Sequence, residues 1–563
     1  MNVTIKGKGQ NLTLNKNDFV ASGGEGSVYR KGNVAFKVYS DPKKMIPVDK
    51  ITELGALTLP NIIRPQDILL DSRNKPIGYT MRYLKDTFAL CQLFPKAFKE
   101  RMGIKPADIV PLVKKFRELV FHCHSHGILI VDMNEYNFLV NDAFTDIYGI
   151  DCDSYQTKSF NAPVIMDSIR DRHATSPTGR YAASELTDWF SFGVTTFQLF
   201  IGIHPFKGKH PTIKSLDDRM MNNISVMNAE VGVPAICYPL SNIPQAYQDW
   251  YKAIFEQGKR VAPPQDMQAA VVLVKKVRIA GSNNFIIKKI QVFPDNIVRF
   301  DTHAKVTLTE TGIYSDARLD HSYAKAPAVG VTNGGKVLAA TVSGGKLKLF
   351  NVSRGQDIAV DMDAEYVMSY DGRLYFKAAG KFCQLEVAEA GVQTFVAAAL
   401  RCQVADHSTK VLDGVVIQDA LGACFASVFP TDKTCYTVHV KELDGLRIVD
   451  AKFDNRVLMA LTYEAGKYNK YIFRFDKAIA TYDVRTEKDI GTVGLNFVTL
   501  STGVCLHMNS KDELELFSHD PKSSGMKTFD DPALSGDIKL MRDGTTAMFA
   551  RGDELYTFEV KKP

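Results

Sequence analysis

The stretch that decides how this chain is interpreted is His126-Gly-Ile-Leu-Ile-Val-Asp132-Met-Asn-Glu-Tyr-Asn137-Phe-Leu-Val140. An acid and an amide stand five residues apart between two apolar runs. That pattern predicts a polar loop held over one pocket by buried segments on either side. Asp132 can orient and deprotonate a hydroxyl group, and Asn137 can hold a cation through its amide oxygen.

A glycine-rich segment lies upstream, Ala21-Ser-Gly-Gly-Glu-Gly-Ser-Val-Tyr29, and Val34-Ala-Phe-Lys37 follows it. Glycines let backbone N–H groups approach phosphates closely, and a lysine on the next strand can neutralise them. Either piece alone is typical of an ordinary hairpin. The separation of eleven positions between Gly26 and Lys37 suits a hairpin with Lys37 on its return strand. Together the two pieces predict a phosphate site.

Two acids follow the polar loop in Ile147-Tyr-Gly-Ile-Asp151-Cys-Asp153, which is expected to be a strand that ends in carboxylates. Acids at strand ends often only form turns. Mg²⁺, however, prefers hard oxygen ligands such as carboxylates. The strand register favours Asp151 as the principal metal ligand, with Asp153 as the alternative or as a second ligand.

Taken in order, these motifs resemble those of a protein kinase over about residues 15–275. The resemblance implies ATP as cofactor with Mg²⁺ or Mn²⁺, and catalytic roles for Lys37, Asp132 and Asn137. Asn137, Asp151 and Asp153 would be the metal ligands. Glu53 would pair with Lys37, and Met81 would lie at the hinge that receives adenine. The implied ATP-binding residues are Ser22, Gly23, Gly24, Gly26, Val28, Ala35, Lys37, Glu53, Met81 and Tyr83.

Further kinase-like pieces have structural roles. Ala183-Ser-Glu185 resembles the Ala-Pro-Glu motif, and Arg260 is expected to pair with Glu185. Asp188-Trp-Phe-Ser-Phe-Gly193 matches the buried helix that supports the catalytic loop. The ending Asp151–Gln156 is most similar to that of an atypical prokaryotic or viral branch of the eukaryotic-like kinase superfamily.

Three departures from the kinase pattern bear on activity. Ile130 and Val131 replace His-Arg before the catalytic acid, Asn134 replaces a lysine, and Asp153 replaces a glycine. Loss of a preorganised positive charge at position 134 would slow phosphate transfer. The favoured function is an ATP/Mg²⁺-dependent Ser/Thr protein kinase. The alternative is a pseudokinase, a nucleotide-binding scaffold without catalysis.

The chain changes character near residue 275. Residues 109–126 and 188–200 have helical patterns, whereas short alternating runs separated by turn residues fill the remainder. The expected fold is an α+β bilobal kinase-like domain over 1–275, with lobes over about 1–84 and 85–275, followed by an all-β domain over 280–563. Strand-like runs recur every 35–55 residues or so, which favours a six- or seven-bladed β-propeller over a pair of β-sandwiches.

The charge, the apolar runs and the cysteines of the chain exclude several other classes of function. The chain has 563 residues and a formal net charge of +6, without the dense basic runs that would indicate nucleic-acid binding. No run approaches the length of a membrane span, and nine scattered cysteines suit a reducing cytoplasm. His122 and His126 share a helical face, which is more typical of packing than of a metal site.

No cluster of acids or histidines stands out in 280–563, so the propeller is expected to recruit a protein partner or substrate. A third hypothesis makes it a ligand-binding or hydrolytic module that the kinase part regulates.

Overall fold

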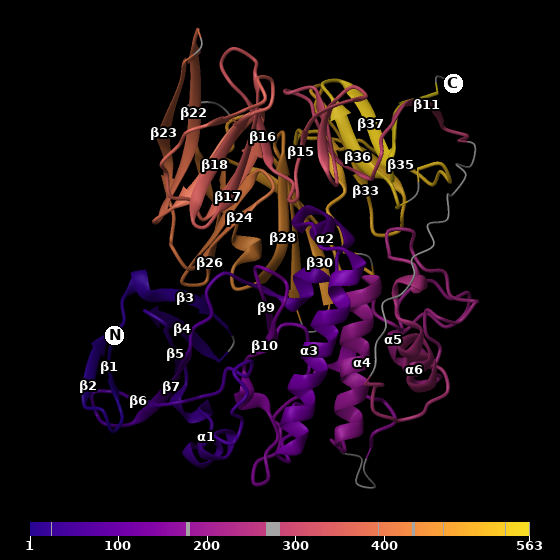
Figure 1. Ribbon diagram of the computed structural model, residues 1–563. Coiled ribbons are helices and arrows are strands. Elements are labelled where there is room, and N and C mark those ends of the chain that lie inside the picture. Colours follow the sequence, from indigo (N-terminus) through magenta and orange to yellow (C-terminus); the bar gives the residue numbers. More distant parts are fainter. Residues whose placement is uncertain are drawn as a thin grey trace.

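The computed structural model describes residues 1–23, 25–175, 181–265, 282–391, 393–430, 434–464, 467–491, 493–534 and 536–561. The chain forms a mixed α/β N-terminal region and a large all-β C-terminal region, drawn in indigo to magenta and in orange to yellow in Figure 1. The boundary expected between residues 275 and 280 falls outside the described residues. No helix in the described ranges is both long enough and apolar enough to cross a membrane.

The N-terminal region begins with a seven-stranded antiparallel sheet in the order β2-β1-β6-β7-β5-β4-β3. Its strands are β1 (Asn2–Ile5), β2 (Gln10–Thr13), β3 (Phe19–Ser22), β4 (Gly26–Lys31), β5 (Val34–Tyr39), β6 (Ile68–Leu70) and β7 (Pro76–Arg82). The β4–β5 hairpin pairs Val28 with Lys37, as the spacing predicts. A side chain at Gly26 would place its Cβ 2.2 Å from the carbonyl oxygen of Val38, so only glycine fits there.

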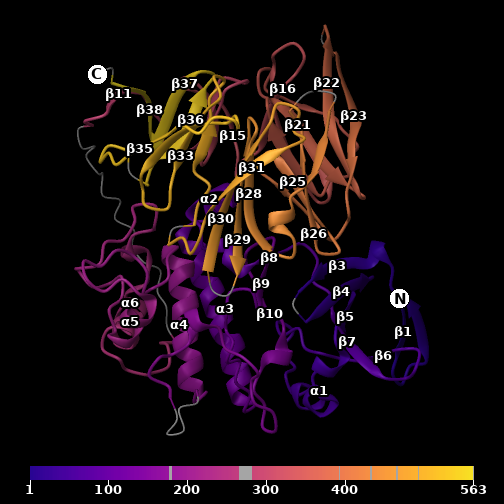
Figure 2. The ribbon, with the colours of Figure 1, turned by 180° about the vertical axis from the view of Figure 1, so that it is seen from behind.

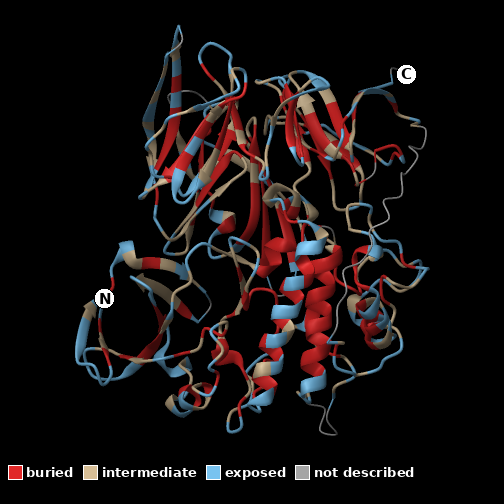
Figure 3. Ribbon diagram, in the orientation of Figure 1, coloured by how far each residue is buried: buried red, intermediate tan, exposed pale blue. Residues whose placement is uncertain are grey.

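Helices dominate the rest of this region. They are α1 (Val48–Leu54), α2 (Lys96–Met102), α3 (Pro106–Ser125), α4 (Glu185–Ile201), α5 (Leu216–Met221) and α6 (Gln245–Phe255). The two long helices predicted from the apolar patterns are confirmed as α3 and α4. Figure 3 shows α4 in red along nearly its whole length, and every residue from 187 to 201 is buried. A small sheet in the order β10-β9-β8 lies beside α3; its strands are β8 (Thr87–Ala89), β9 (Phe138–Asn141) and β10 (Ile147–Gly149).

The all-β region consists of seven four-stranded antiparallel sheets within the described ranges. In chain order the first three are β12 (Ile297–Asp301), β13 (Val306–Thr309), β14 (Gly312–Ser315), β15 (Arg318–Ser322); β16 (Ala328–Val331), β17 (Val337–Ser343), β18 (Lys346–Asn351), β19 (Gln356–Ile358); and β20 (Tyr366–Tyr370), β21 (Arg373–Ala378), β22 (Lys381–Ala390), β23 (Gln393–Gln403). The next three are β24 (Thr409–Leu412), β25 (Val415–Ala420), β26 (Ala423–Val428), β27 (Tyr436–His439); β28 (Arg447–Asp454), β29 (Val457–Glu464), β30 (Lys467–Phe475), β31 (Tyr482–Glu487); and β32 (Phe497–Thr499), β33 (Val504–Met508), β34 (Leu514–Ser518), β35 (Met526–Phe529). The seventh joins β11 (Phe285–Val292) to β36 (Lys539–Asp543), β37 (Thr546–Arg551) and β38 (Glu554–Val560).

The sheets pack one against the next in a closed series. A buried apolar cluster joins each sheet to its successor, as Leu308 and Val329 do between the first two in chain order. The series returns to its start, because Tyr314 of β14 packs with Met548 of β37. The seventh sheet is closed by residues far apart in sequence, since β11 pairs antiparallel with β38. Sheets arranged in this order differ from the two facing layers of a β-sandwich.

The two regions share one hydrophobic core. Val449, Leu461 and Tyr463 of the β28–β31 sheet belong to the same buried cluster as the apolar faces of α3 and α4. Arg101 of α2 donates two hydrogen bonds to Asp450, at 3.1 and 3.2 Å. Figures 1 and 2 both show this sheet above the helices and the β24–β27 sheet above the N-terminal sheet. The β-region is therefore packed directly against the N-terminal region.

Candidate functional site

The loop around Asp132 is held in an unusual backbone conformation. Val131 has φ 60°, a left-handed value that a β-branched residue rarely adopts. The carboxylate of Asp188, at the start of α4, accepts the N–H groups of Ile130 and Val131 at 2.8 and 2.9 Å. Asp188 is buried, and its Oδ2 also lies 2.9 Å from His124 Nε2. Backbone strain fixed in this way is typical of a functional site.

Asp132 itself is buried and fully hydrogen-bonded. Its carboxylate accepts the side-chain amides of Asn134 at 2.8 Å and Asn137 at 3.4 Å, and the backbone N–H of Met166 at 2.9 Å. Burial raises the pKa of Asp132, and these hydrogen bonds oppose the shift. Met166 in turn accepts a hydrogen bond from Tyr463 of the β-region through its sulfur. The acid is therefore covered by the chain's own segments.

Lys37 joins both acids that follow β10. Its ammonium donates to Asp151 Oδ1 at 2.7 Å and to Asp153 Oδ2 at 2.6 Å, and lies 3.6 Å from Glu25. It is 8% exposed, and these carboxylates raise its pKa well above the ordinary value against the effect of burial. Lys37 is thus a permanent, oriented positive charge.

The two acids have different surroundings. The side chain of Asp151 is 40% exposed, whereas that of Asp153 is 4% exposed. Burial and the neighbouring Asp153 raise the pKa of Asp151. Lys37 and the Tyr39 hydroxyl, 2.5 Å from Asp153 Oδ2, hold the pKa of Asp153 low against burial. Asp153 therefore anchors Lys37, and Asp151 is the acid that a cation could reach.

A cavity of about 810 Å³ brings the predicted residues together. Those that line it are Ser22, Gly23, Gly26, Val28, Ala35, Lys37, Met81, Tyr83, Asn137 and Asp151. Of the other predicted residues that the structure describes, Glu53, Asp132 and Asp153 do not line it, and Gly24 lies outside the described residues. The lining places apolar side chains beside Lys37 and Asp151, as in pockets that bind a ligand with one flat and one charged end.

Two predicted ion pairs are not formed. Lys37 has the three acidic partners above, and Glu53 instead accepts the backbone N–H of Ser159 at 3.3 Å. The side chain that α1 directs toward the site is Lys50, which donates to the carbonyl oxygen of Asp153 at 2.6 Å. Arg260 pairs with Asp171 through two hydrogen bonds of 2.5 and 2.6 Å, not with Glu185, whose side chain is 62% exposed. The buried carboxylate of Asp171 is stabilised by a positively charged partner, and Arg260 is that partner.

Sequence reasoning missed the far wall of the cavity, which belongs to the β-region. His407 lies 3.3 Å from Arg30 Nη1, and its ring centre is 6.2 Å from that of Tyr83. Lys410, Arg447 and Val449 continue this wall. They come from β24, from β28 and from the loop before β24, so no local motif in the sequence could have indicated them.

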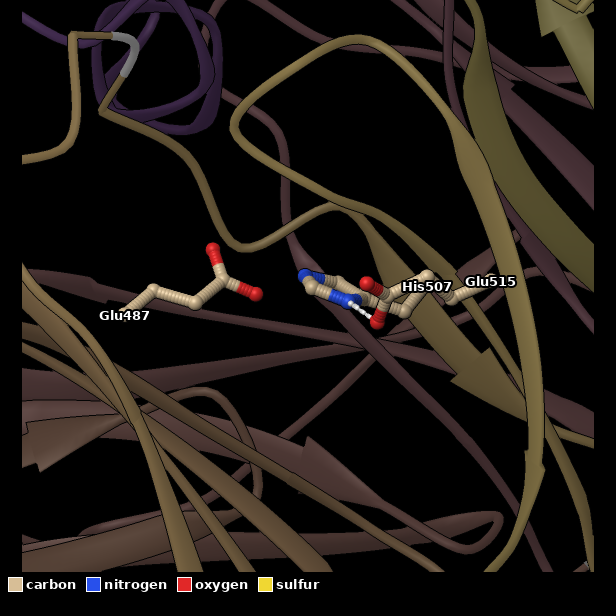
Figure 4. Close-up of side chains that lie close together, drawn as sticks. All are labelled: Glu487, His507 and Glu515. Carbon is tan, nitrogen blue, oxygen red and sulfur yellow. Dashed lines mark hydrogen bonds and ion pairs between the residues drawn. The ribbon is translucent and has the colours of Figure 1, made fainter. Parts of the chain in front are cut away.

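One cluster of potential metal ligands occurs among the described residues, and it lies outside this cavity. Figure 4 shows Glu487, His507 and Glu515, whose ligand atoms are within 4.8 Å of one another. Lys470 lies 3.1 Å from His507 Nε2, and Arg485 donates to Glu515 at 2.5 Å. No such cluster was predicted in 280–563 from the sequence. Two cations balance its two carboxylates, so it is a closed ion-pair network.

Comparison with known proteins gives a distant similarity. No protein family model matches the chain. Ribosomal protein S6 kinase alpha-3 of Mus musculus and that of Homo sapiens each match 153 residues at 26% identity, which is 26% of this chain. The match spans 19% of the length of each relative. This similarity supports a distant, kinase-like relation for part of the chain.

Proposed function

We propose that this protein is an ATP- and Mg²⁺-dependent protein kinase that phosphorylates serine or threonine hydroxyls. The observation that carries the proposal is the cavity in which Lys37, hydrogen-bonded to Asp151, faces Asn137, with Val28, Ala35 and Met81 beside them. The ammonium suits phosphate, and the apolar residues suit an adenine ring. The distant similarity to an S6 kinase supports the same assignment.

The residues present fit a divalent cation. Asn137 donates its amide N–H to the backbone oxygen of Asp132 at 2.9 Å, which leaves its amide oxygen for a ligand. Asp151 is the partly exposed carboxylate, and its neighbour Ile150 donates its N–H to the Asn137 carbonyl at 2.8 Å. Asn137 and Asp151 would hold Mg²⁺ or Mn²⁺, which when bound neutralises phosphate charge.

The reaction uses residues of this chain as follows. Lys37 binds and orients the phosphates, and Asp132 accepts the proton of the substrate hydroxyl. The bond from the hydroxyl oxygen to the γ-phosphorus forms while the bond from that phosphorus to the β-phosphate oxygen breaks, and ADP leaves. Burial raises the pKa of Asp132, which makes it a stronger base than an exposed aspartate. Met166 must move from Asp132 before a hydroxyl can reach it.

We further infer that the all-β region is a seven-bladed propeller that positions a protein partner or substrate. Seven consecutive four-stranded sheets and the pairing of β11 with β38 support this fold assignment. The shared core with the N-terminal region supports a role at the cavity, since the β-region cannot move without disturbing that core.

The test is transfer of the γ-phosphate from Mg·ATP to protein by the full chain and by Asp132→Ala. We expect transfer by the wild type and a loss of at least about 10³-fold in the variant. Asp142→Ala, in the exposed turn between β9 and β10, is the matched control and should transfer normally. Absence of transfer to every protein tried, with Mg·ATP still bound, would exclude a kinase.

A second candidate is a nucleotide-binding scaffold without catalysis. The observation in its favour is that the carboxylate of Asp132 already accepts hydrogen bonds from Asn134, Asn137 and Met166. Tyr463 in turn donates a hydrogen bond to Met166. Tight Mg·ATP binding by Asp132→Ala and wild type alike, with no turnover in either, is the result that this candidate predicts.

A further inference from the structure

The wall that the β-region contributes to the cavity has its own chemistry. It is formed by three neighbouring sheets: the β20–β23 sheet supplies Tyr366 and Lys377, the β24–β27 sheet Lys410, and the β28–β31 sheet Arg447 and Val449. A ligand in the kinase-like cleft would therefore face side chains from the β-region across the cavity. The charges on this wall decide what such a ligand can be.

Two cations on the wall lack an acidic partner. Lys377 pairs with Glu365 at 2.5 Å. By contrast, the ammonium of Lys410 donates to the carbonyl oxygen of Ile448 at 2.6 Å, and within the described ranges neither Lys410 nor Arg447 has a carboxylate within 4.0 Å. The nearby acid Asp450 already holds Arg101 through two hydrogen bonds.

The two cations also act on each other. Burial lowers the pKa of Lys410, and the guanidinium of Arg447 lowers it further. Both side chains are exposed toward the cavity, and like charges that lie close together repel each other. An anion bound between Lys410 and Arg447 would remove this repulsion. The arrangement is thus complementary to a negatively charged group.

Arg447 lies beside the catalytic loop. Its guanidinium sits 4.9 Å from the centre of the Tyr136 ring, one residue before Asn137. Arg447 also lines the same cavity as Asn137. A group bound by Arg447 would therefore lie next to the site of transfer. The loop has no cation of its own at position 134, where Asn134 stands.

The space limits the kind of molecule. A volume of about 810 Å³ is within the range of pockets for small ligands, so a folded domain cannot enter beside a nucleotide. An extended peptide can, because it is one strand wide. The wall also carries Tyr366, Leu446 and Val449, which suit the apolar side chains that a peptide brings along with its carboxylates.

We propose that Lys410 and Arg447 form an anion-binding site that holds an aspartate or glutamate side chain of an extended peptide substrate, so that this protein selects serines and threonines flanked by acidic residues. The site makes the β-region a determinant of substrate specificity as well as a wall of the cleft. The proposal rests on the proposed kinase function for the transfer step, whereas peptide binding can be measured without it.

The first experiment measures binding by the full chain of fluorescein-labelled peptides in which alanine replaces the phosphoacceptor serine. One peptide carries glutamates on both sides of the alanine, one carries glutamines and one carries lysines. The wild type should bind the glutamate peptide at least about tenfold more tightly than the glutamine peptide. Arg447→Met and Lys410→Met should each remove most of that difference, and Arg447→Glu should favour the lysine peptide.

Lys467→Met, at the exposed start of β30 in the same sheet, is the control and should bind all three peptides like the wild type. An unchanged urea-unfolding midpoint in every variant will show that the chain is still folded. Equal binding of the glutamate and glutamine peptides by the wild type would overturn the proposal. So would competition by inorganic phosphate at the two cations without any peptide binding, which would instead indicate a small anionic ligand.

The second experiment uses the serine-containing peptides in the transfer assay. Arg447→Met should raise the KM for the glutamate peptide about tenfold or more relative to the KM for the glutamine peptide. Charge-dependent peptide binding without any transfer would refute the kinase function and leave the anion site standing. Transfer that ignores acidic residues would refute the anion site and leave the kinase standing.

Discussion

The carboxylate of Asp188 accepts the backbone N–H of Val131 at 2.9 Å, and Val131 is the residue that enters the loop of Asp132 with φ 60°. A buried acid on the most buried helix thus supports the strained turn that precedes Asp132. Because the same carboxylate also accepts the N–H of Ile130, the loop depends on a single side chain.

Asp188→Asn should destabilise the N-terminal region. An amide offers one acceptor where the carboxylate offers two, so at least one buried N–H loses its partner, at a cost of about 2–3 kcal/mol. Urea unfolding followed by the fluorescence of Trp189 and Trp250 reports this region. Asp249→Asn, on the exposed side of α6, is the control and should leave unfolding unchanged. Equal stability of the two variants would contradict the supporting role of Asp188.

Gly26→Ala should weaken the β4–β5 hairpin. The added Cβ would lie 2.2 Å from the Val38 oxygen, so the strands must separate, which costs about 1–3 kcal/mol. Calorimetric unfolding and Mg·ATP affinity should both decline. Gly23→Ala is the matched control in the same turn, since no atom lies within 4 Å of its new Cβ. A loss in both variants would mean that flexibility of the turn matters rather than the close approach to Val38.

The stability of the N-terminal region should fall in mild acid because of His204. Burial lowers the pKa of His204 to about 3, whereas an unfolded histidine has a pKa of about 6.5. Between these values the unfolded chain binds the extra proton, so stability is complete above about pH 6.5 and decreases as the pH falls toward 3. The loss from about pH 7 to about pH 5 should be about 2 kcal/mol.

The measurement is urea unfolding by tryptophan fluorescence at both pH values, for the wild type and for His204→Asn. The variant has no imidazole to titrate there, so its pH dependence should be smaller by that amount, whatever its absolute stability. An identical pH dependence in the two proteins would show that His204 is not the group responsible.

The contact between Arg101 and Asp450 should couple the two regions. A double-mutant cycle with Arg101→Met and Asp450→Asn should give a coupling energy of about 1–2 kcal/mol, at the lower end for a buried pair because the Arg101 side chain is 37% exposed. The exposed pair of Lys8 and Asp67 is the comparison and should give less than about 0.5 kcal/mol. Equal couplings would mean that the regions are held by their apolar core alone.

The sequence alone predicted those parts of the structure that the local spacing of residues determines. The segment from Gly26 to Lys37 forms a hairpin that places Lys37 at the cavity, and the apolar run from 188 to 200 lies within the buried helix α4. Backbone pairing and helical periodicity depend on neighbours in the chain, so both can be inferred from residue order.

The features that the sequence did not predict depend on contacts between segments that are distant in the chain. α1 is seven residues long and directs Lys50 rather than Glu53 toward the site, and two acids close to Lys37 already satisfy its charge. Arg260 pairs with Asp171, which is buried and requires a positively charged partner. The sequence does not reveal this burial. The spacing of the strand-like runs was compatible with either six or seven sheets. Only the pairing of β11 with β38 fixes the number at seven. Lys410 and Arg447 reach the cavity through packing between regions, which no motif encodes.

The pairing of β11 with β38 also has a consequence for biosynthesis. The first strand of the all-β region cannot find its partner until residues 554–560 have emerged from the ribosome. During translation of more than 260 residues, β11 remains an open edge rich in apolar side chains, the kind of edge on which nascent chains associate wrongly. A message truncated just before β38 would therefore yield a chain with almost all of its residues and no closed series of sheets.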